Sequence, residues 1–280
     1  SEAGIDLILV GDSAGNNVLG YDSTVPVSME EAVMLTAAVA RAKPRSLVVG
    51  DMPFGSFQAS DADAVDNAVR LVKAGADAVK FQTRIPTEVY ARGQRPGAYD
   101  FQSDNPQWMA PVYGEHRERL EFTYGQWNEL FDYCRELNIA AFSTPFDETA
   151  VDFLERKMRP PLYKIASFEV NHIPLLRRVG ATRKPVILST GMATADEINS
   201  AVRALKQSGC PALVLLKCVS AYPARPEDFN LRALALLRDQ FGTPVGVSDH
   251  TMSDEVALGT IALGGCVIEK HLTLDRSDGV

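Results

Sequence analysis

The stretch that decides the fold reads PVILSTGMATADEINSAVRALKQSGCPALVLLKC, residues 185–218. Two almost wholly apolar runs, Pro185–Thr190 and Ala212–Cys218, flank the amphipathic segment Thr194–Ser208. Apolar runs of this length that end in polar residues are typical of strands buried on both faces of a parallel sheet. A strand, a helix and a second strand in this order predict a right-handed βαβ unit.

The same alternation continues along the rest of the chain. Seven further strands are predicted at Asp6–Gly11, Ser46–Asp51, Ala76–Gln82, Ile139–Thr144, Leu162–Ser167, Pro244–Asp249 and Cys266–His271. Further helices are predicted from Ser28 to Arg41, where Ser28 and Glu31 form a capping-box pattern, and at Asp61–Ala74, Tyr124–Leu137, Thr149–Lys157 and Asn230–Gln240. The pattern predicts an α/β protein, a (β/α)8 TIM barrel formed by residues 1–280 as a single domain. Eight strands close such a barrel, so the ninth is an extra N-terminal βα unit, an edge strand or a false assignment, and the last βα unit is truncated.

Composition and charge narrow the function. The hydrophobic content of 46% and charged content of 23% are ordinary for a folded soluble protein, and the net charge of −8 argues against a nucleic-acid partner. No apolar run approaches the roughly 18 residues of a membrane-spanning helix, so no membrane partner is expected. The four cysteines contain no CxxC pair and indicate free thiols in a reducing, cytoplasmic compartment. The chain starts at Ser1 and ends soon after a strand, which indicates a piece of a longer protein.

The segment Arg84–Leu120 is long and rich in proline, glycine, glutamine and aromatic residues. It predicts an extended loop over the barrel mouth, which is either a functional lid or an insertion without a role.

Active sites of such barrels lie at the carboxyl ends of the strands. Reading those ends in order gives a ring of hydroxyls, lysines, acids and histidines: Asp12, Asp51, Lys80, Gln82, Ser143, Thr144, Lys164, Ser167, Glu169, Ser189, Thr190, Cys218, Ser220, Ser248, Asp249, His250 and His271. A buried ammonium needs a partner, so Lys80 and Lys164 indicate an anionic ligand. The hydroxyls together favour a phosphate-bearing substrate, although each one separately also fits a helix N-cap. His250 and His271 end the last two strands and either hold one divalent metal or are unrelated strand caps.

From about Gly75 onward the chain resembles the N-acetylneuraminate synthase family, the phosphoenolpyruvate-condensing sialic acid synthases. Within that family, the run Lys217–Ala224 looks more like the pseudaminate or legionaminate branch. The matching motifs are Val79–Thr83, Phe142–Phe146, Tyr163–Glu169, Ile187–Met192, Leu216–Pro223, Val247–Thr251 and Glu269–His271. The resemblance implies a metal-dependent transferase of carbohydrate biosynthesis that joins phosphoenolpyruvate to an N-acetylated amino sugar aldehyde, forms a nonulosonic acid and releases phosphate.

The resemblance also assigns roles to residues. His250 and His271 would hold Mn²⁺ or Mg²⁺, while Lys80 and Lys164 would neutralise the substrate carboxylate and phosphate. Hydroxyls that would fix the substrate oxygens are those of Thr144, Ser167, Ser189, Ser220 and Ser248. Gln82, Glu169 and Tyr222 would face the amino sugar. Asp51 stands where the family's first strand carries a catalytic Glu, and the family's Asn-His motif after it is absent.

The first part of the chain resembles another barrel family. Gly4–Ser13, Gly20–Thr24 and Val49–Ser56 are similar to ketopantoate hydroxymethyltransferase, and Gly75–Lys80 is shared by both families. The chain is thus an apparent chimera, with residues 1–75 like one family and residues 76–280 like the other. That second resemblance implies Mg²⁺ at Asp12 and Asp51, with Ser13 and Lys80 nearby, but Gln82 replaces its third metal carboxylate.

Three functions therefore stay open. The first and favoured one is the phosphoenolpyruvate-dependent synthase, the second is ketopantoate hydroxymethyltransferase, and the third is a folded but catalytically incomplete barrel. The synthases also carry a C-terminal module through which they dimerise. That module is not found in these residues, so the formation of a homo-oligomer is left open.

Overall fold

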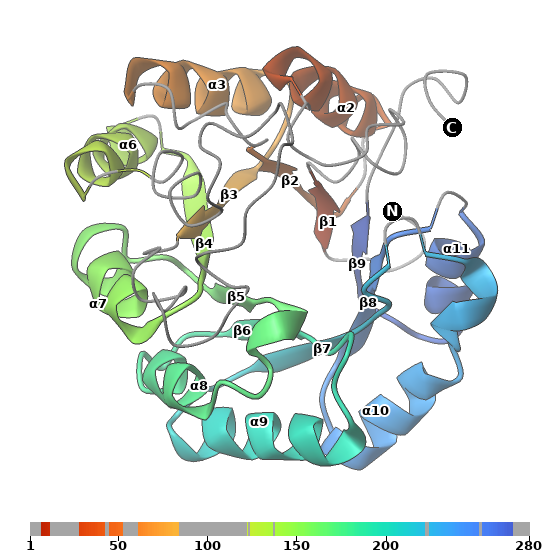
Figure 1. The fold of residues 1–280 in the computed structure, drawn as a ribbon. Helices are drawn as coiled ribbons and strands as arrows, with labels where there is room; N and C mark the ends of the chain where they lie inside the picture. The colour runs from red at the N-terminus through yellow and green to blue at the C-terminus, as the bar shows by residue number, and fades with distance from the viewer. Residues whose placement is uncertain are drawn as a thin grey trace, which may run out of the picture.

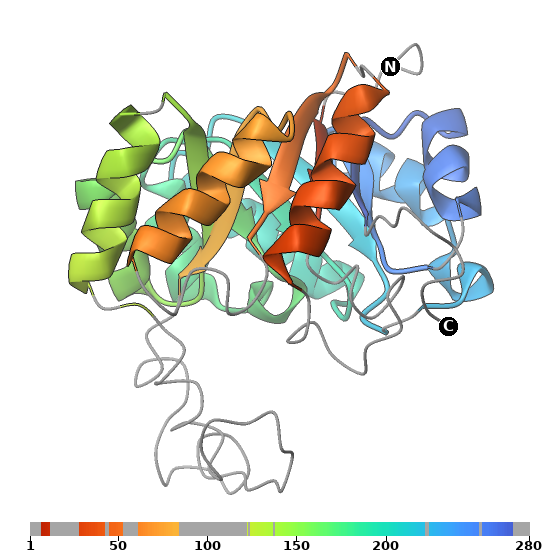
Figure 2. The same ribbon diagram turned by 90° about the horizontal axis from the view of Figure 1, so that it is seen from above.

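The computed structural model describes residues 7–11, 28–42, 45–52, 61–83, 122, 124–136, 138–221, 224–251 and 254–270. Within these residues, nine parallel strands form one closed barrel, and the helices surround it (Figure 1). Seen from above, the helices lie along the outside of the strands (Figure 2). The predicted α/β barrel is confirmed.

Every predicted strand is present, with ends that differ by one or two residues. The strands are β1 (Leu7–Val10), β2 (Leu47–Asp51), β3 (Ala78–Thr83), β4 (Ala140–Pro145), β5 (Tyr163–Ile165), β6 (Val186–Ser189), β7 (Leu213–Cys218), β8 (Val245–Asp249) and β9 (Val267–Lys270). The helices are α2 (Met29–Arg41), α3 (Asp61–Lys73), α6 (Tyr124–Glu136), α7 (Glu148–Lys157), α8 (Ile173–Gly180), α9 (Ala195–Gln207), α10 (Ala233–Phe241) and α11 (Glu255–Ala262). Short 3-10 turns occur at η1 (Ser167–Glu169) and η2 (Pro226–Phe229).

The strand that exceeds the eight of a TIM barrel is part of the barrel wall. β1 pairs with β2 through Leu9 and Val49, and with β9 through Leu9 and Glu269. β8 and β9 also pair directly, so β1 widens the ring instead of standing at an edge. The barrel therefore has nine strands, and the extra N-terminal strand is part of its wall. A parallel strand with two open edges can be inserted wherever both neighbours offer free backbone groups, which the sequence pattern does not reveal.

Helix starts follow local side-chain chemistry. Ser28 Oγ accepts a hydrogen bond from the Glu31 backbone N–H at 3.2 Å, and the Ser28 backbone N–H donates to the Glu31 carboxylate, which confirms the predicted capping box. Sequence analysis missed α8 and α11. Both are only eight residues long, and a window of two turns is too short for a clear helical period.

The barrel interior changes from apolar to polar along the strands. Toward their amino ends, two small interior clusters formed around Val49, Phe142, Ile187 and Val267 fill the space, and Leu162 packs against both. Side chains on one strand alternate between the two faces, so residues two positions further on point inward at the next layer. These next residues are Asp51, Thr144, Lys164, Ser189 and Glu269. The period of two therefore places a polar layer on an apolar floor.

Outside the barrel, aromatic side chains hold α6 against β3. The Trp127 ring lies 5.7 Å from the Phe81 ring, edge to face, and stacks at 5.2 Å on Phe131, one helical turn further along. Phe122 lies 5.0 Å from Trp127 on its other side. Such pairs stabilise by about 0.5–1.5 kcal/mol each beyond the burial of their area. They fix the position of α6, which forms one wall of a pocket described below.

The turns that lead from helices back to strands share a backbone feature. Each turn before β3 to β9 has one residue of positive φ: Gly75, Asn138, Arg159, Arg183, Gly209, Gly242 and Gly264. A left-handed residue after a helix satisfies the last free carbonyls, and glycine or asparagine takes this conformation at least cost. Arg159 and Arg183 keep a large side chain there in spite of that cost.

Two further expectations concern the long loop and membrane-spanning segments. The predicted loop Arg84–Leu120 lies outside the described residues. None of the helices in the described part is long and apolar enough to cross a membrane.

Candidate functional site

The predicted ring of side chains lies at the carboxyl ends of the strands. Ten of the described candidates come from strands β2 to β7 and the residues that follow them, and from β8: Asp51, Lys80, Gln82, Thr144, Lys164, Ser167, Glu169, Ser189, Ser220 and Ser248. His250 follows β8 directly. Asp12, Ser13, Tyr222 and His271 lie outside the described residues, so their predicted roles stay predictions.

Lys80 forms a buried ion pair with Asp51. The two residues are direct neighbours across β2 and β3, and Lys80 Nζ lies 3.0 Å from Asp51 Oδ2. Their side chains are only 4% and 7% exposed. A buried ammonium needs such a partner, so the pair explains how β3 can carry a lysine inside the barrel.

Lys164 lies on β5, two strands from Lys80 in the ring, and it contacts a carboxylate on β9. Its Nζ donates to Ser189 Oγ at 2.7 Å and to the Ile165 carbonyl at 3.3 Å. The same ammonium lies 3.3 Å from Glu269 Oε2 on β9. Lys164 is buried, so this pairing is screened little by water.

Glu269 joins the two lysines and His250 electrostatically. Burial acts most strongly on this carboxyl and would raise its pKa, but Lys164, Lys80 and His250 together hold the pKa below its ordinary value. Its Oε2 is buried and forms no hydrogen bond within the described part of the chain, although it pairs with Lys164. The charges of both lysines thus act on the same buried carboxylate.

Sequence analysis did not single out Glu269. It appears there only as part of the motif that ends in His271. Its position two residues after Val267, which lies in an interior cluster, is the signal that could have identified it, because alternate strand residues share a face.

His250 is held in one tautomer by the backbone. Its Nδ1 lies 2.7 Å from the Val219 carbonyl oxygen, which can only accept a hydrogen bond, so Nδ1 carries the proton. Burial is the main cause that lowers the pKa of this imidazole, so the ring is neutral. Nε2 therefore presents a lone pair, and Ser248 Oγ lies 3.3 Å from it. This orientation is the one that metal-binding histidines usually have.

Two hydroxyl groups and one thiol group lie close together at Gly191, in the turn after β6. The Gly191 N–H donates to Ser167 Oγ at 3.0 Å. A methyl group added at Gly191 would collide with Ser220 Oγ, come within 2.9 Å of Ser167 Oγ and approach Cys218 Sγ to 3.1 Å. Ser167 and Ser220 thus converge on one point from β5 and β7. Burial raises the pKa of the Cys218 thiol, which stays protonated.

None of the five predicted hydroxyl residues serves as the N-cap of a helix that the structure describes. The α-helices that follow β4, β5 and β6 begin after Asp147, His172 and Thr194. The alternative interpretation of Thr144, Ser167, Ser189, Ser220 and Ser248 as helix caps is therefore wrong, and their hydroxyls belong to the polar end of the barrel.

We expect the Gly191→Ala substitution to weaken binding of a phosphate-bearing substrate by about 10-fold, because the methyl group pushes the Ser167 and Ser220 hydroxyls aside. The backbone of Gly191 does not have positive φ, so the fold should be kept. Calorimetric titration with phosphoenolpyruvate, next to a thermal unfolding curve, measures both effects. An unchanged Kd would show that these hydroxyls do not contact the ligand.

Glu169 has a partner outside the strand ends. Its Oε2 lies 3.1 Å from His172 Nδ1, and His172 Nε2 lies 3.7 Å from Glu148 Oε2. The histidine therefore stands between two carboxylates at the rim. Glu169 was predicted from the resemblance, whereas His172 was not considered.

The described residues fit a metal only in part. His250 offers a neutral, oriented Nε2, but no group of three or more His, Cys, Asp and Glu residues in the described part could hold a metal ion. β8 and β9 pair Asp249 with Lys270, the residues just before the two predicted ligands His250 and His271. Asp51, the alternative metal ligand, already faces the Lys80 ammonium, and a cation beside a cation is unfavourable.

Comparison with known proteins decides the family. The model of the NeuB family matches residues 65–280. The chain belongs to the NeuB family. A model described as ketopantoate hydroxymethyltransferase matches residues 1–90. The two ranges overlap at residues 65–90, which include the stretch Gly75–Lys80 that both resemblances share.

Several relatives of this NeuB-family chain are similar to it over most of its length. A pseudaminic acid synthase of Campylobacter jejuni is 35% identical over 79% of this chain and 64% of its own length. The human N-acetylneuraminate-9-phosphate synthase is 32% identical over 80% of this chain and 61% of its own. An uncharacterised protein of Methanocaldococcus jannaschii is 42% identical over 73% of this chain and 56% of its own. The chain thus spans between about half and two thirds of these relatives.

Solved structures agree with the NeuB-family assignment. The N-acetylneuraminic acid synthetase of Leptospira borgpetersenii superposes with a TM-score of 0.62 and 25% identity, over 98% of this chain and 75% of that one. The spore coat polysaccharide biosynthesis protein SpsE of Bacillus subtilis gives 0.61 and 27%, over 98% of this chain and 61% of that one. The chain thus shares its barrel with both of these proteins.

Proposed function

We propose that this NeuB-family barrel condenses phosphoenolpyruvate with the open-chain aldehyde of an N-acetylated amino sugar and releases phosphate. The observation that carries the proposal is the presence of two buried lysines inside the barrel at the carboxyl ends of the strands, Lys164 3.3 Å from Glu269 and Lys80 3.0 Å from Asp51. Two anionic groups on one small substrate need positive charge that is already in place before the reaction. The names of the relatives support the product class, a nonulosonic acid.

The chain's own residues would hold the substrate. Lys164 and Ser189 form one hydrogen-bonded unit, to which a phosphate or carboxylate oxygen would add. Ser167 and Ser220, whose hydroxyl groups lie beside Gly191, would contribute two more hydrogen-bond donors. Lys80, two strands away on β3, would neutralise the second anionic group.

The reaction forms one carbon–carbon bond. Carbon 3 of phosphoenolpyruvate attacks the aldehyde carbon, water adds to carbon 2, and phosphate leaves with its bridging oxygen. A divalent metal held by His250 and His271 would polarise the aldehyde oxygen as a Lewis acid. The Val219 carbonyl keeps the His250 proton on Nδ1, so the lone pair of the imidazole is on Nε2. Gln82 and Glu169 would face the sugar.

Glu269 has a second effect on binding. It is the partner of Lys164 in the free protein, and an incoming phosphate would take over that role. The substrate and Glu269 therefore compete for the same ammonium group. This competition limits affinity and lets product phosphate leave.

The test separates binding from turnover. Phosphoenolpyruvate is titrated into the full chain with Mn²⁺ in a calorimeter, and phosphate release is then measured with N-acetylmannosamine and with a 2,4-diacetamido sugar. Binding together with phosphate release supports the proposal, and the better sugar identifies the substrate. Absence of binding contradicts it.

The two alternative functions have distinct signatures. Phosphoenolpyruvate binding without phosphate release from either sugar means a catalytically incomplete barrel. The match of residues 1–90 is the observation that favours ketopantoate hydroxymethyltransferase. This range includes Asp51, one of the two metal carboxylates that the resemblance implies. That function predicts Mg²⁺-dependent binding of a branched 2-oxo acid, which the ion pair between Lys80 and Asp51 disfavours.

A further inference from the structure

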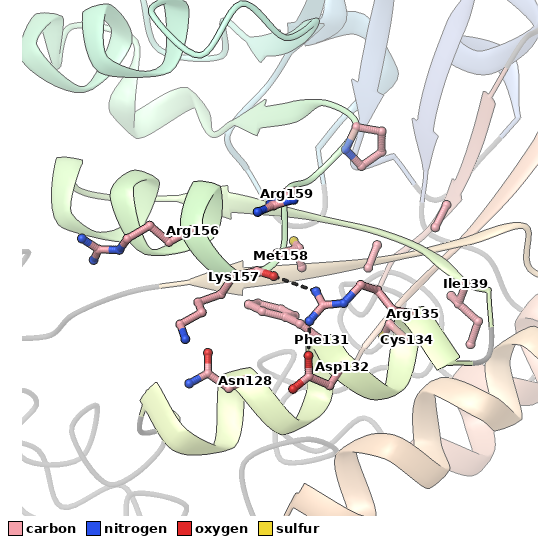
Figure 3. A pocket seen from close by; sticks show the side chains of 13 residues that line it. Asn128, Phe131, Asp132, Cys134, Arg135, Ile139, Arg156, Lys157, Met158 and Arg159 are labelled. Carbon is pink, nitrogen blue, oxygen red and sulfur yellow. Dashed lines mark hydrogen bonds and ion pairs between the residues drawn. The ribbon is translucent and has the colours of Figure 1, made fainter.

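A pocket lies at the opposite end of the barrel from the candidate site. It has a volume of about 850 Å³ and opens between the C-terminal ends of α6 and α7, beside the start of β4 at Ala140 (Figure 3). This volume is within the range of small-molecule pockets, about 300–1,000 Å³. Phe131, Ile139 and Met158 supply an apolar lining. None of the predicted site residues lines this pocket, so it is separate from the proposed reaction.

The lining is strongly cationic in a chain whose net charge is −8. It contains Arg135, Arg156, Lys157 and Arg159, against one carboxylate, that of Asp132. Basic residues often stabilise helix C-termini, so part of this charge has a structural cause. Each helix end carries only about half a negative charge. After Asp132 and two helix ends are counted, the pocket keeps about two units of positive charge.

Among the described residues, only Arg135 of these four cations has a structural partner. Arg135 Nη1 donates to the Lys157 carbonyl at the end of α7, at 2.7 Å, and its other terminal nitrogen pairs with Asp132. Arg156, Lys157 and Arg159 form no ion pair within the residues that the structure describes. Figure 3 shows them on the α7 side, with Asn128 across from them on α6. All three side chains are exposed members of the lining, so they are accessible to an anion.

Asn128 offers a buried hydrogen-bond acceptor. Its Oδ1 is shielded from solvent and has no hydrogen-bond partner within the described residues. An unpaired buried acceptor is costly, which favours a ligand that also carries hydroxyl or amide donors. The ligand therefore needs an anionic group at one end and donors at the other.

Arg159 is held in the pocket at the expense of backbone strain. Its φ is 53°, whereas the equivalent turns after α3, α9, α10 and α11 use glycine. A large side chain in this conformation is a reason to look for a role. The pocket supplies one, because the guanidinium lies among its lining groups.

We propose that this pocket binds a phosphate monoester on a hydroxyl-bearing skeleton of the size of a sugar phosphate or a nucleoside monophosphate. Arg156, Lys157 and Arg159 contact the phosphate, and a hydroxyl group donates to Asn128 Oδ1. The carbon skeleton rests on Phe131 and Met158. Guanidinium groups match phosphate geometry well. The overall negative charge of the chain excludes a long polyanion such as RNA.

The experiment uses three probes: glucose 6-phosphate, uridine 5′-monophosphate and inorganic phosphate. Their Kd values are measured by calorimetry with the full chain and with Arg159→Gly, which removes one guanidinium and also relieves the strained backbone, so the variant should fold. We expect at least one ester to bind about 10-fold more tightly than inorganic phosphate, and Arg159→Gly to weaken that ester by about 10-fold. Lys157→Gln should weaken it in the same direction.

The matched control is Arg183→Gly. Arg183 has a φ of 59° in the corresponding turn after α8, and it does not line the pocket. This variant should bind the ester as the unmodified chain does. The tighter of the two esters identifies the ligand class. The proposal is overturned if neither ester binds, if inorganic phosphate binds equally well, or if Arg159→Gly and Lys157→Gln leave the ester's Kd unchanged, since binding would then lie elsewhere.

Discussion

Replacing Lys164 by methionine is expected to lower the free energy of unfolding by about 3–5 kcal/mol, because it leaves the Glu269 carboxylate buried without its nearest cation. The same change should weaken phosphoenolpyruvate binding by at least about 100-fold, since the ammonium group would be a direct ligand of the substrate. Urea unfolding and calorimetric titration measure the two effects.

A second substitution separates charge from packing. Glu269→Gln keeps the shape of the side chain and removes the carboxylate, so the Lys164→Met/Glu269→Gln double variant should be more stable than Lys164→Met alone. On its own, Glu269→Gln should bind phosphoenolpyruvate about 10-fold more tightly, because the competitor for Lys164 is lost. Additive losses of stability would contradict the pairing, and weaker binding would contradict the competition.

Lys217 supplies the matched control. It is a half-buried lysine near the end of β7, where burial lowers its pKa, but its Nζ donates to the Cys218 carbonyl and lies 5.6 Å from the Phe229 ring centroid. Lys217→Met should therefore cost less than about 1 kcal/mol and leave phosphoenolpyruvate binding unchanged.

The pair also has a defined pH dependence. The pKa of Glu269 is lowered in the folded state, so its contribution to stability is complete above the ordinary value of 4.5 and is lost as the pH falls further. Glu269→Gln removes this part of the acid sensitivity. Unfolding curves of both proteins below pH 5 should therefore converge.

The second large effect concerns His250. We expect His250→Gln to weaken Mn²⁺ binding and to slow phosphate release by at least about 100-fold each, because the proposed metal loses an oriented imidazole. Metal affinity is measured directly, by calorimetry or by the electron paramagnetic resonance signal of free Mn²⁺, so the result does not depend on turnover.

His172→Gln is the control for metal affinity. His172 stands between Glu148 and Glu169 at the rim and is not a proposed ligand, so the Kd for Mn²⁺ should stay the same. If His250→Gln binds Mn²⁺ as tightly as the unmodified chain, the assignment of a metal to His250 and His271 is wrong.

The sequence alone predicted the strands and the polar side chains at their carboxyl ends. The ends of the strands could be predicted because the apolar runs end in polar residues, as in Pro185–Thr190. Lys80 and Lys164 were identified because a lysine in a buried strand needs a local partner or a ligand. Both signals lie within one strand, so they can be recognised without knowing which other strands pack beside it.

Glu269 was not predicted, because the signal for it is not local. Its importance depends on Lys164 and Lys80, which belong to strands far from it in the chain. Arg159 is a similar case, since a basic residue after a helix looks ordinary until α6 and α7 enclose it.

What the sequence by itself determined, then, is the order of strands and helices and the polar layer at one end of the barrel, because a period of two and a period of 3.6 are properties of neighbouring residues. Only the tertiary structure decided that β1 closes a ring of nine, that Lys80 pairs with Asp51 and Lys164 with Glu269, and that Val219 fixes the tautomer of His250. Those outcomes depend on which distant backbone and side-chain groups meet when the barrel closes.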